Sequence, residues 1–261
     1  MREAKIDRPG ASFTIFDGEA TTRPVIGRLA AVGLTDEIND RHFVVVDGMD
    51  GKVHYADIAR VRPDTLPGRG AIVSLDVQHP DSQSTQDKQR ARLRVLSYLN
   101  LERLTATEGL TWLDRELASK SPAFVNDQGF GSDVKSALRN RLQWLTERGM
   151  VEPMPDGGVR PAPAAMRALA NREISQAVDK HSAISGLHAA QLMDGERFEG
   201  TYTKPISLAS GKFAVFENSK EFTLVPWRPS FEYIRGKEVT GKVDGSTIAW
   251  ELAGRSRGLG I

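Results

Sequence analysis

The spacing of apolar residues changes twice along the 261-residue chain, and this change restricts the possible folds more than any other feature. Apolar residues first come in short, β-branched runs bounded by turn residues, which is typical of strands. They then recur every three to four residues, as on one face of a helix, before short aromatic-rich runs return. The pattern predicts an α+β protein in which two β-rich regions flank a helical middle segment.

The first β-rich region is expected over residues 21–80, after a lead-in over residues 1–20 without clear periodicity. Its predicted strands are Val25–Val32, Phe43–Asp47, Val53–Ile58 and Ala71–Val77. The connection Asp47-Gly48-Met49-Asp50-Gly51 has the length and composition of a hairpin turn. Short strands with so little chain between them favour a small antiparallel β-barrel.

The middle segment is expected over residues 81–190, following the polar stretch from Gln78 to Gln89, which we interpret as a linker. Leu93, Leu96, Leu99 and Leu104 have roughly helical spacing, and Leu110, Leu113 and Leu117 continue it in a second helix. A third helix is expected to begin near Ser132, its N-cap, and to stop at Gly149. A short hairpin over 151–160 and a helix over 164–182 follow. This order resembles a winged helix.

A helical wheel of the third helix separates a polar face from an apolar arc. Lys135, Arg139 and Gln143 follow one another at four-residue steps on the polar face. Arg141 lies within the apolar arc and should therefore extend to solvent or pair with a carboxylate. In a winged helix this face would contact DNA, with Arg160 of the hairpin against phosphate. The alternative is an ordinary solvated helix face beside a surface turn.

The second β-rich region is expected over residues 191–253. Its predicted strands are Phe198–Tyr202, Phe213–Phe216, Phe222–Val225, Val239–Val243 and Thr247–Leu252. These also suggest a small barrel-like unit. Residues 254–261 form a glycine-rich basic tail that contains Arg255 and Arg257 and is expected to be flexible.

The charge balance requires any nucleic-acid contact to be local. Lys and Arg number 35 against 34 Asp and Glu, a formal net charge of +1, so the chain has no overall cationic field. Residues 1–82 carry a net −3 and residues 83–150 a net +3. The chain has no cysteine, which excludes disulfides and thiolate metal ligands. It has no spanning apolar run and no apolar segment at its N-terminus, so we expect a cytoplasmic protein without membrane insertion.

Motifs of known enzyme classes are missing from the sequence. It contains no phosphate-binding glycine loop, no H-E-x-x-H helix and no G-x-S-x-G turn. His42 and His54 would approach each other if their strands pair, and His181 and His188 are seven residues apart, but no histidine triplet has ligand spacing. Asp114 and Glu116 would point in different directions on one helix. We expect no metal, no cofactor and no catalytic residue, with an enzyme of unrecognised type as an alternative.

Several segments resemble the region that follows the nuclease in large conjugative relaxases, the mobilisation proteins of the type that nicks Ti-plasmid borders. The resemblance begins near residue 25 and extends to the C-terminus. Its segments are Ile26-Gly27-Arg28, Gly33-Leu34, Asp36-Glu37, Asp40-Arg41-His42, Val46-Asp47-Gly48, Asp50-Gly51, Val53-His54-Tyr55, Gly109 to Leu117, Gly129-Phe130-Gly131, Ser207 to Ala214, Leu224 to Pro229 and Arg257 to Ile261. Val225-Pro226-Trp227-Arg228-Pro229 is the most specific of them.

The resemblance implies a context and no particular reaction. The family's nuclease uses a tyrosine nucleophile and a metal-binding histidine cluster, whereas the resemblance here covers only the region after it. We therefore expect a non-catalytic accessory domain that binds transfer-origin DNA or relaxosome partners. Alternatively, the chain is a protein-interaction module that contacts coupling or type IV secretion proteins without DNA. Residues expected to bind such a partner are Trp227, Arg228, Arg255 and Arg257.

Overall fold

The computed structural model describes residues 12–16, 23–36, 41–58, 65–77, 91–244 and 247–252. The chain forms two compact units, Met1–Ala170 and Asn171–Ile261, which are considered separately. Most of the predicted lead-in, the polar linker and the C-terminal tail lie outside the described residues, and Arg255 and Arg257 lie there with the tail. None of the helices within the described ranges is long and apolar enough to cross a membrane.

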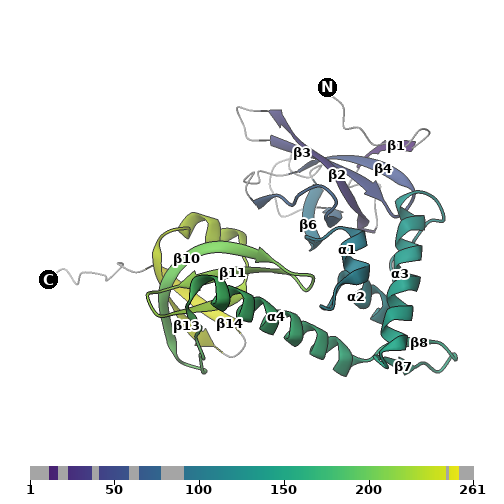
Figure 1. The fold of residues 1–261 in the computed structure, drawn as a ribbon. Coiled ribbons are helices and arrows are strands. Elements are labelled where there is room, and N and C mark those ends of the chain that lie inside the picture. The colour runs from purple at the N-terminus through teal and green to yellow at the C-terminus, as the bar shows by residue number, and fades with distance from the viewer. Residues whose placement is uncertain are drawn as a thin grey trace. The chain divides into compact units, whose positions relative to one another are not determined.

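The first unit contains a closed five-stranded barrel (Figure 1). Its strands are β2 (Val25–Asp36), β3 (Arg41–Gly48), β4 (Lys52–Ile58), β5 (Ile72–Val77) and β6 (Ala91–Ser97). Strands β2, β3 and β4 form an antiparallel meander, β5 pairs with the free edge of β2, and β6 pairs with β5. A parallel pairing of Ile58 with Ala91 closes the barrel between β4 and β6. This strand order and its single parallel closure are the connectivity of the OB-fold.

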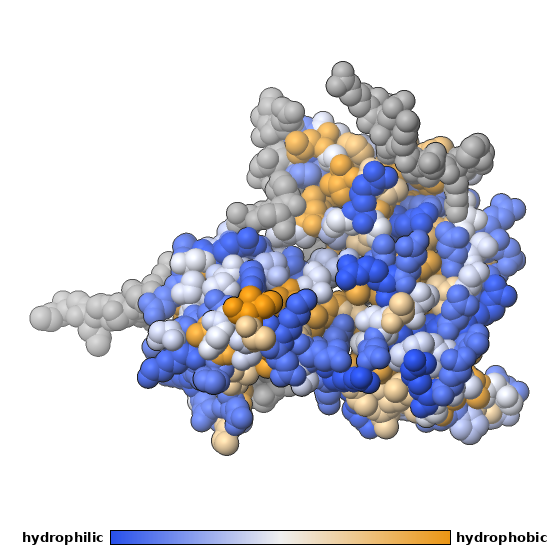
Figure 2. All heavy atoms as spheres, viewed as in Figure 1, coloured by the Kyte–Doolittle hydropathy of each residue, from blue (hydrophilic) through white to orange (hydrophobic). Residues whose placement is uncertain are grey.

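Alternating side chains explain the barrel. Val44 and Val46 on β3 and Ala56 and Ile58 on β4 point into its core, which is formed by Phe16, Leu29, Val44, Val46, Ala56, Ile58, Ala71, Val73, Leu75 and Ala91. A further strand, β1 (Ser12–Ile15), pairs in parallel with β4 and carries two exposed apolar side chains, Phe13 and Ile15. Figure 2 shows apolar side chains at the surface over this barrel, among polar ones.

The helix predicted across Leu93 and Leu96 is wrong, because residues 91–97 form strand β6. Consequently the barrel extends past residue 80, where the sequence suggested a boundary. The alternation Ala91, Leu93, Val95 supplies the strand's apolar side, while Arg92 and Arg94 are exposed.

The helical segment has the predicted winged-helix order. It consists of α1 (Leu101–Ala106), α2 (Trp112–Ala118), α3 (Phe130–Glu147), the hairpin β7 (Val151–Pro153) and β8 (Val159–Pro161), and α4 (Pro163–Ser185). Asn100 caps α1, and Thr111 and Asp114 form a reciprocal capping box on α2. The predicted N-cap of the third helix, Ser132, is wrong, because α3 begins at Phe130 after Gly129, whose φ of 64° favours glycine.

The second unit contains the C-terminal part of α4 and a six-stranded sheet in the order β14-β13-β10-β11-β12-β9. The strands are β9 (His188–Ala189), β10 (Arg197–Ser207), β11 (Lys212–Glu217), β12 (Glu221–Pro226), β13 (Glu238–Asp244) and β14 (Thr247–Leu252). A 3-10 helix, η2 (Pro229–Ile234), lies between β12 and β13. The core consists of Phe198, Tyr202, Ala214, Phe216, Val225, Phe231 and Val239.

Candidate nucleic-acid interface

A buried ion pair holds α2 and α3 together. Arg141 of α3 and Asp114 of α2 have fully buried side chains, and Arg141 Nε donates to Asp114 Oδ1 over 2.7 Å. The guanidinium also donates to Asp114 Oδ2 (2.9 Å) and to the carbonyl oxygens of Thr107 (2.6 Å) and Gly109 (2.9 Å), just before α2. Both charges are therefore compensated by several hydrogen bonds, as burial requires. Of the two outcomes expected for Arg141 from the sequence, extension to solvent or pairing with a carboxylate, the structure shows the second.

The same carboxylate serves the helix cap. Asp114 Oδ2 accepts hydrogen bonds from the Thr111 backbone N–H (2.7 Å) and hydroxyl (2.9 Å). One residue thus fixes both the start of α2 and the position of α3. This network fixes α3 rigidly against α2.

Lys135, Arg139 and Gln143 lie along one side of α3, as predicted. Each has a partner nearby: Lys135 pairs with Asp127, Arg139 Nη2 donates to Ser136 Oγ (3.3 Å), and Gln143 donates to Glu147 (2.9 Å). Arg139 and Gln143 are exposed, and Lys135 is partly exposed. Such contacts at the surface contribute about 0–1 kcal/mol, so they leave the groups able to bind a ligand.

Arg160 lies on β8 of the hairpin, next to α3 in the same unit. Its guanidinium pairs with Glu152 of β7 over 2.7 Å, and the two side chains are 40% and 34% exposed. Gly157, with φ of 83°, makes the turn between the two strands. The hairpin therefore presents a cation that is tied across its own strands rather than extended into solvent.

An arginine that the sequence analysis missed lies at the C-terminal end of α3. The Arg148 guanidinium lies 4.1 Å from the centre of the Trp144 ring, and the Arg141 guanidinium is 4.3 Å from the same ring. Arg148 is exposed and donates to the Trp144 carbonyl oxygen over 3.3 Å. An arginine four residues after a tryptophan on one helix would have been the signal for this pair.

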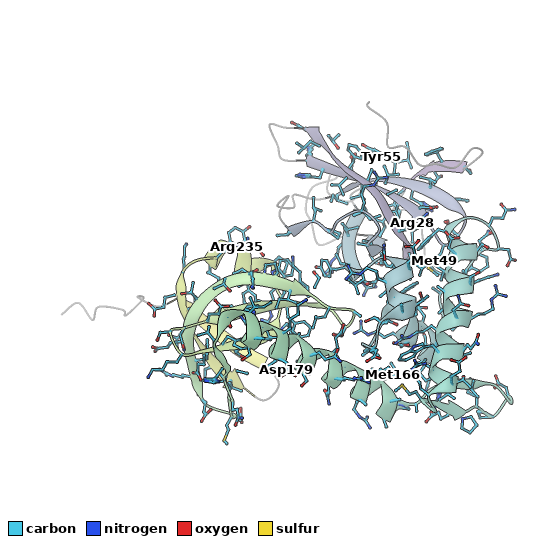
Figure 3. The ribbon with its side chains drawn as sticks, viewed as in Figure 1. Arg28, Met49, Tyr55, Met166, Asp179 and Arg235 are labelled. Atoms are coloured by element: carbon cyan, nitrogen blue, oxygen red, sulfur yellow. The ribbon has the colours of Figure 1, made fainter. Side chains whose placement is uncertain are left out.

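The most specific sequence motif forms a polar cluster inside the second unit. Trp227 Nε1 donates to Glu232 Oε1 (3.0 Å) and to the Tyr202 hydroxyl oxygen (3.2 Å), while the Tyr202 hydroxyl donates to Glu232 (2.8 Å). Arg235 completes the cluster by pairing with Glu232 (Figure 3 labels Arg235). Burial favours the neutral acid, but the hydrogen bonds from Tyr202, Trp227 and Arg235 outweigh it and lower the pKa of Glu232. Trp227 therefore has a structural role.

A partly exposed lysine and an exposed arginine adjoin Trp227. Lys212 Nζ lies 3.7 Å from the centre of the Trp227 ring, and Trp227 itself is partly exposed. Arg228, the residue before η2, is exposed. Of the four residues predicted to bind a partner, the structure describes Trp227 and Arg228, which are adjacent in the chain.

Among the described histidines, His42 and His54 do not come together as the sequence suggested. The strand register places His42 opposite Ile58 and His54 opposite Val46. His54 Nε2 instead contacts Asp50 Oδ2 (2.9 Å), and His181 Nε2 contacts Glu217 (2.7 Å). No group of three potential metal ligands occurs among the residues that the structure describes.

Comparison with known proteins gives one match. The profile of the family "Protein of unknown function (DUF3363)" matches residues 1–91 and 78–260, which together cover nearly the whole chain. No curated protein and no solved structure matches significantly. The chain therefore belongs to the DUF3363 family of proteins of unknown function.

Proposed function

We propose that this protein is a non-catalytic accessory region of a conjugative relaxase that binds transfer-origin DNA in the cytoplasm. The observation that carries the proposal is the row of partly exposed Lys135 and exposed Arg139 and Gln143 on a helix fixed by the Arg141–Asp114 pair. The resemblance of the sequence to relaxases supplies the biological context.

The order of elements supports duplex DNA as the ligand. In helix-turn-helix proteins the second helix of the motif enters the major groove, and in this segment α3 takes that place. Arginine and glutamine recognise guanine and adenine edges respectively, whereas lysine neutralises phosphate. Arg160 would contact phosphate after its ion pair with Glu152 breaks. Breaking a partly exposed ion pair costs little free energy.

The test is binding of a fluorescent transfer-origin duplex, measured by anisotropy over a range of salt concentrations. Lys135→Glu/Arg139→Glu should weaken binding at least tenfold and reduce the salt slope by about 1, because Lys135 loses a phosphate contact and Arg139 loses a base contact. Lys204→Glu/Lys237→Glu, at two exposed lysines of the second unit, changes the net charge equally and should bind as the wild type does. Unchanged affinity and salt slope in the α3 variant would refute the proposal.

A second candidate is a protein-interaction module that contacts relaxosome, coupling or secretion proteins. Arg228 supports it, because this residue is exposed beside the partly exposed Trp227. Arg228→Glu should then reduce co-purification with such proteins, whereas Lys135→Glu/Arg139→Glu should leave it unchanged. The opposite result would assign the capture to DNA bound on α3.

A further inference from the structure

The first unit contains a groove that the sequence analysis did not identify. Its volume is about 920 Å³, and its walls come from β1, the start of β2, the β3–β4 hairpin, β6, and the chain around and after α2. All of these elements belong to the first unit, and α3 does not line the groove. The groove is therefore distinct from the predicted DNA-binding face.

Cations from three elements line this groove. Arg23 precedes β2, Lys52 begins β4 and Arg94 lies on β6, and all three are exposed. Arg94 Nε lies 3.7 Å from Asp76 Oδ2 in an ion pair, but the arginine side chain is 59% exposed and its other N–H groups can bind a second anion. Arg23 has no ion-pair partner in the described part of the chain, and Lys52 is attracted electrostatically to Asp50 of the same groove.

The carboxylates in the groove already have partners. Asp50 is bound by His54 (2.9 Å) and by the backbone N–H of Lys52 (3.1 Å), and these hydrogen bonds outweigh burial and lower its pKa. Glu116 accepts a hydrogen bond from the Ala123 backbone N–H over 3.2 Å. The groove therefore carries three cations against two carboxylates that are already hydrogen-bonded, and this balance favours an anionic ligand.

Exposed apolar side chains lie beside these cations. Phe124 is 70% exposed and Ile15 is 77% exposed, and both line the groove. Proteins bind single-stranded nucleic acid through exposed aromatic rings, on which bases stack, and through nearby cations, which contact the phosphates. Phe124 and the three cations of the groove provide both. In a duplex the bases are already stacked on each other, so Phe124 has no base to contact.

The barrel connectivity points to the same ligand class. In the OB-fold the second and third strands carry much of the surface that binds oligonucleotides. In this barrel those strands are β3 and β4, and their hairpin contributes Met49, Asp50, Lys52 and His54 to the groove. Met49 is labelled in Figure 3.

We infer that this groove binds single-stranded nucleic acid, with Phe124 stacking on a base and Arg23, Lys52 and Arg94 contacting the phosphates. The inference extends the proposed DNA-binding role from duplex to single-stranded DNA, and it rests on the groove and not on the α3 face. The two can therefore fail separately.

The test measures anisotropy of a fluorescent oligothymidylate and of a hairpin duplex with the full chain. Phe124→Ala should weaken oligothymidylate binding about tenfold, because one stacked base is lost. Arg23→Glu/Lys52→Glu should weaken it further and lower the salt slope by about 1.4. Both variants should bind the duplex within twofold of the wild type. Phe13→Ala is the matched control, since Phe13 is 68% exposed on neighbouring β1 but does not line the groove.

The α3 variant separates the two proposals. Lys135→Glu/Arg139→Glu should lose the duplex and keep oligothymidylate. Wild-type protein that does not bind oligothymidylate, or Phe124→Ala that binds as tightly as Phe13→Ala, would overturn the groove assignment whatever the duplex does. Equal competition by polyglutamate and oligothymidylate would also overturn it, by showing that the groove accepts any polyanion.

Discussion

Removing one member of the Arg141–Asp114 pair leaves the other charge buried without its partner. Arg141→Met should therefore lower the free energy of unfolding by about 3–5 kcal/mol, measured by urea denaturation. Arg139→Met, an exposed position on the same helix, should change it by less than about 0.5 kcal/mol. A loss below about 1 kcal/mol for Arg141→Met would contradict the structural role of this pair.

Tyr202 makes stability depend on alkaline pH. Burial, and then its hydrogen bond to Glu232, raises the pKa of Tyr202 to about 12 from an ordinary value near 10. Because the folded state holds this proton more tightly, the stabilisation is complete below about pH 10 and is lost as the pH approaches 12. Tyr202→Phe should cost about 1 kcal/mol at neutral pH and lose less stability than wild type above pH 10.

The comparison is made on unfolding free energies at several pH values. Burial also raises the pKa values of Tyr55 and Tyr98. Both tyrosines are present in wild type and in Tyr202→Phe, so the difference in alkaline stability between the two proteins reports on Tyr202. Equal alkaline losses in the two proteins would assign the effect to other tyrosines.

At the scale of elements, the contact between the β3–β4 turn and the start of α3 depends on Gly131. A Cβ at this position would lie 2.4 Å from the Asn126 carbonyl oxygen and 2.6 Å from that of Met49. Asn126 also donates to the Asp50 carbonyl oxygen (3.1 Å), and the Arg28 guanidinium lies 5.0 Å from the Phe130 ring centre, so the junction is close on several sides. Figure 3 labels Arg28 and Met49 at this junction.

Gly131→Ala should therefore lower the free energy of unfolding by about 1–3 kcal/mol, since both clashes are with backbone. Gly68→Ala is the control, because a Cβ there has no neighbour within 4 Å. Thermal unfolding of the two variants gives the comparison. Equal melting temperatures for the two variants would show that the junction accommodates the added methyl group without loss of stability.

Local patterns predicted those elements whose apolar spacing was unambiguous. The α3 face and the hairpin over 151–160 followed from period and position alone, which for Arg141 left pairing with a carboxylate and extension to solvent both open. Strand β6 was not predicted, because the leucines from Leu93 to Leu104 have nearly helical spacing. The alternation from Ala91 to Val95, which indicates a strand, covers only five residues and was the weaker signal. The groove could not be predicted, since its lining residues come from segments more than a hundred residues apart, from Thr14 to Phe124, that only the folded unit brings together.

At the scale of the whole molecule, the two units have separate hydrophobic cores, and α4 contributes to both. Leu169 is buried in the first unit, while Ala177 and His181 are buried in the second. His181 also packs edge-on against Phe222, with ring centres 4.5 Å apart. The backbone of α4 is thus one continuous helix, but its two ends are stabilised by side-chain contacts in different cores. Because local stability depends on such contacts, the two ends can differ in stability.

Phe216→Ala should reveal this division by hydrogen exchange. The substitution removes a fully buried ring from the second core and should cost about 3–5 kcal/mol. Exchange should accelerate in β10–β13 and in α4 after residue 171, while β2–β6 and the first turns of α4 keep wild-type rates. Leu29→Ala in the first core should give the reverse pattern. Uniform acceleration along α4 would show instead that the helix opens as one element and couples the two cores.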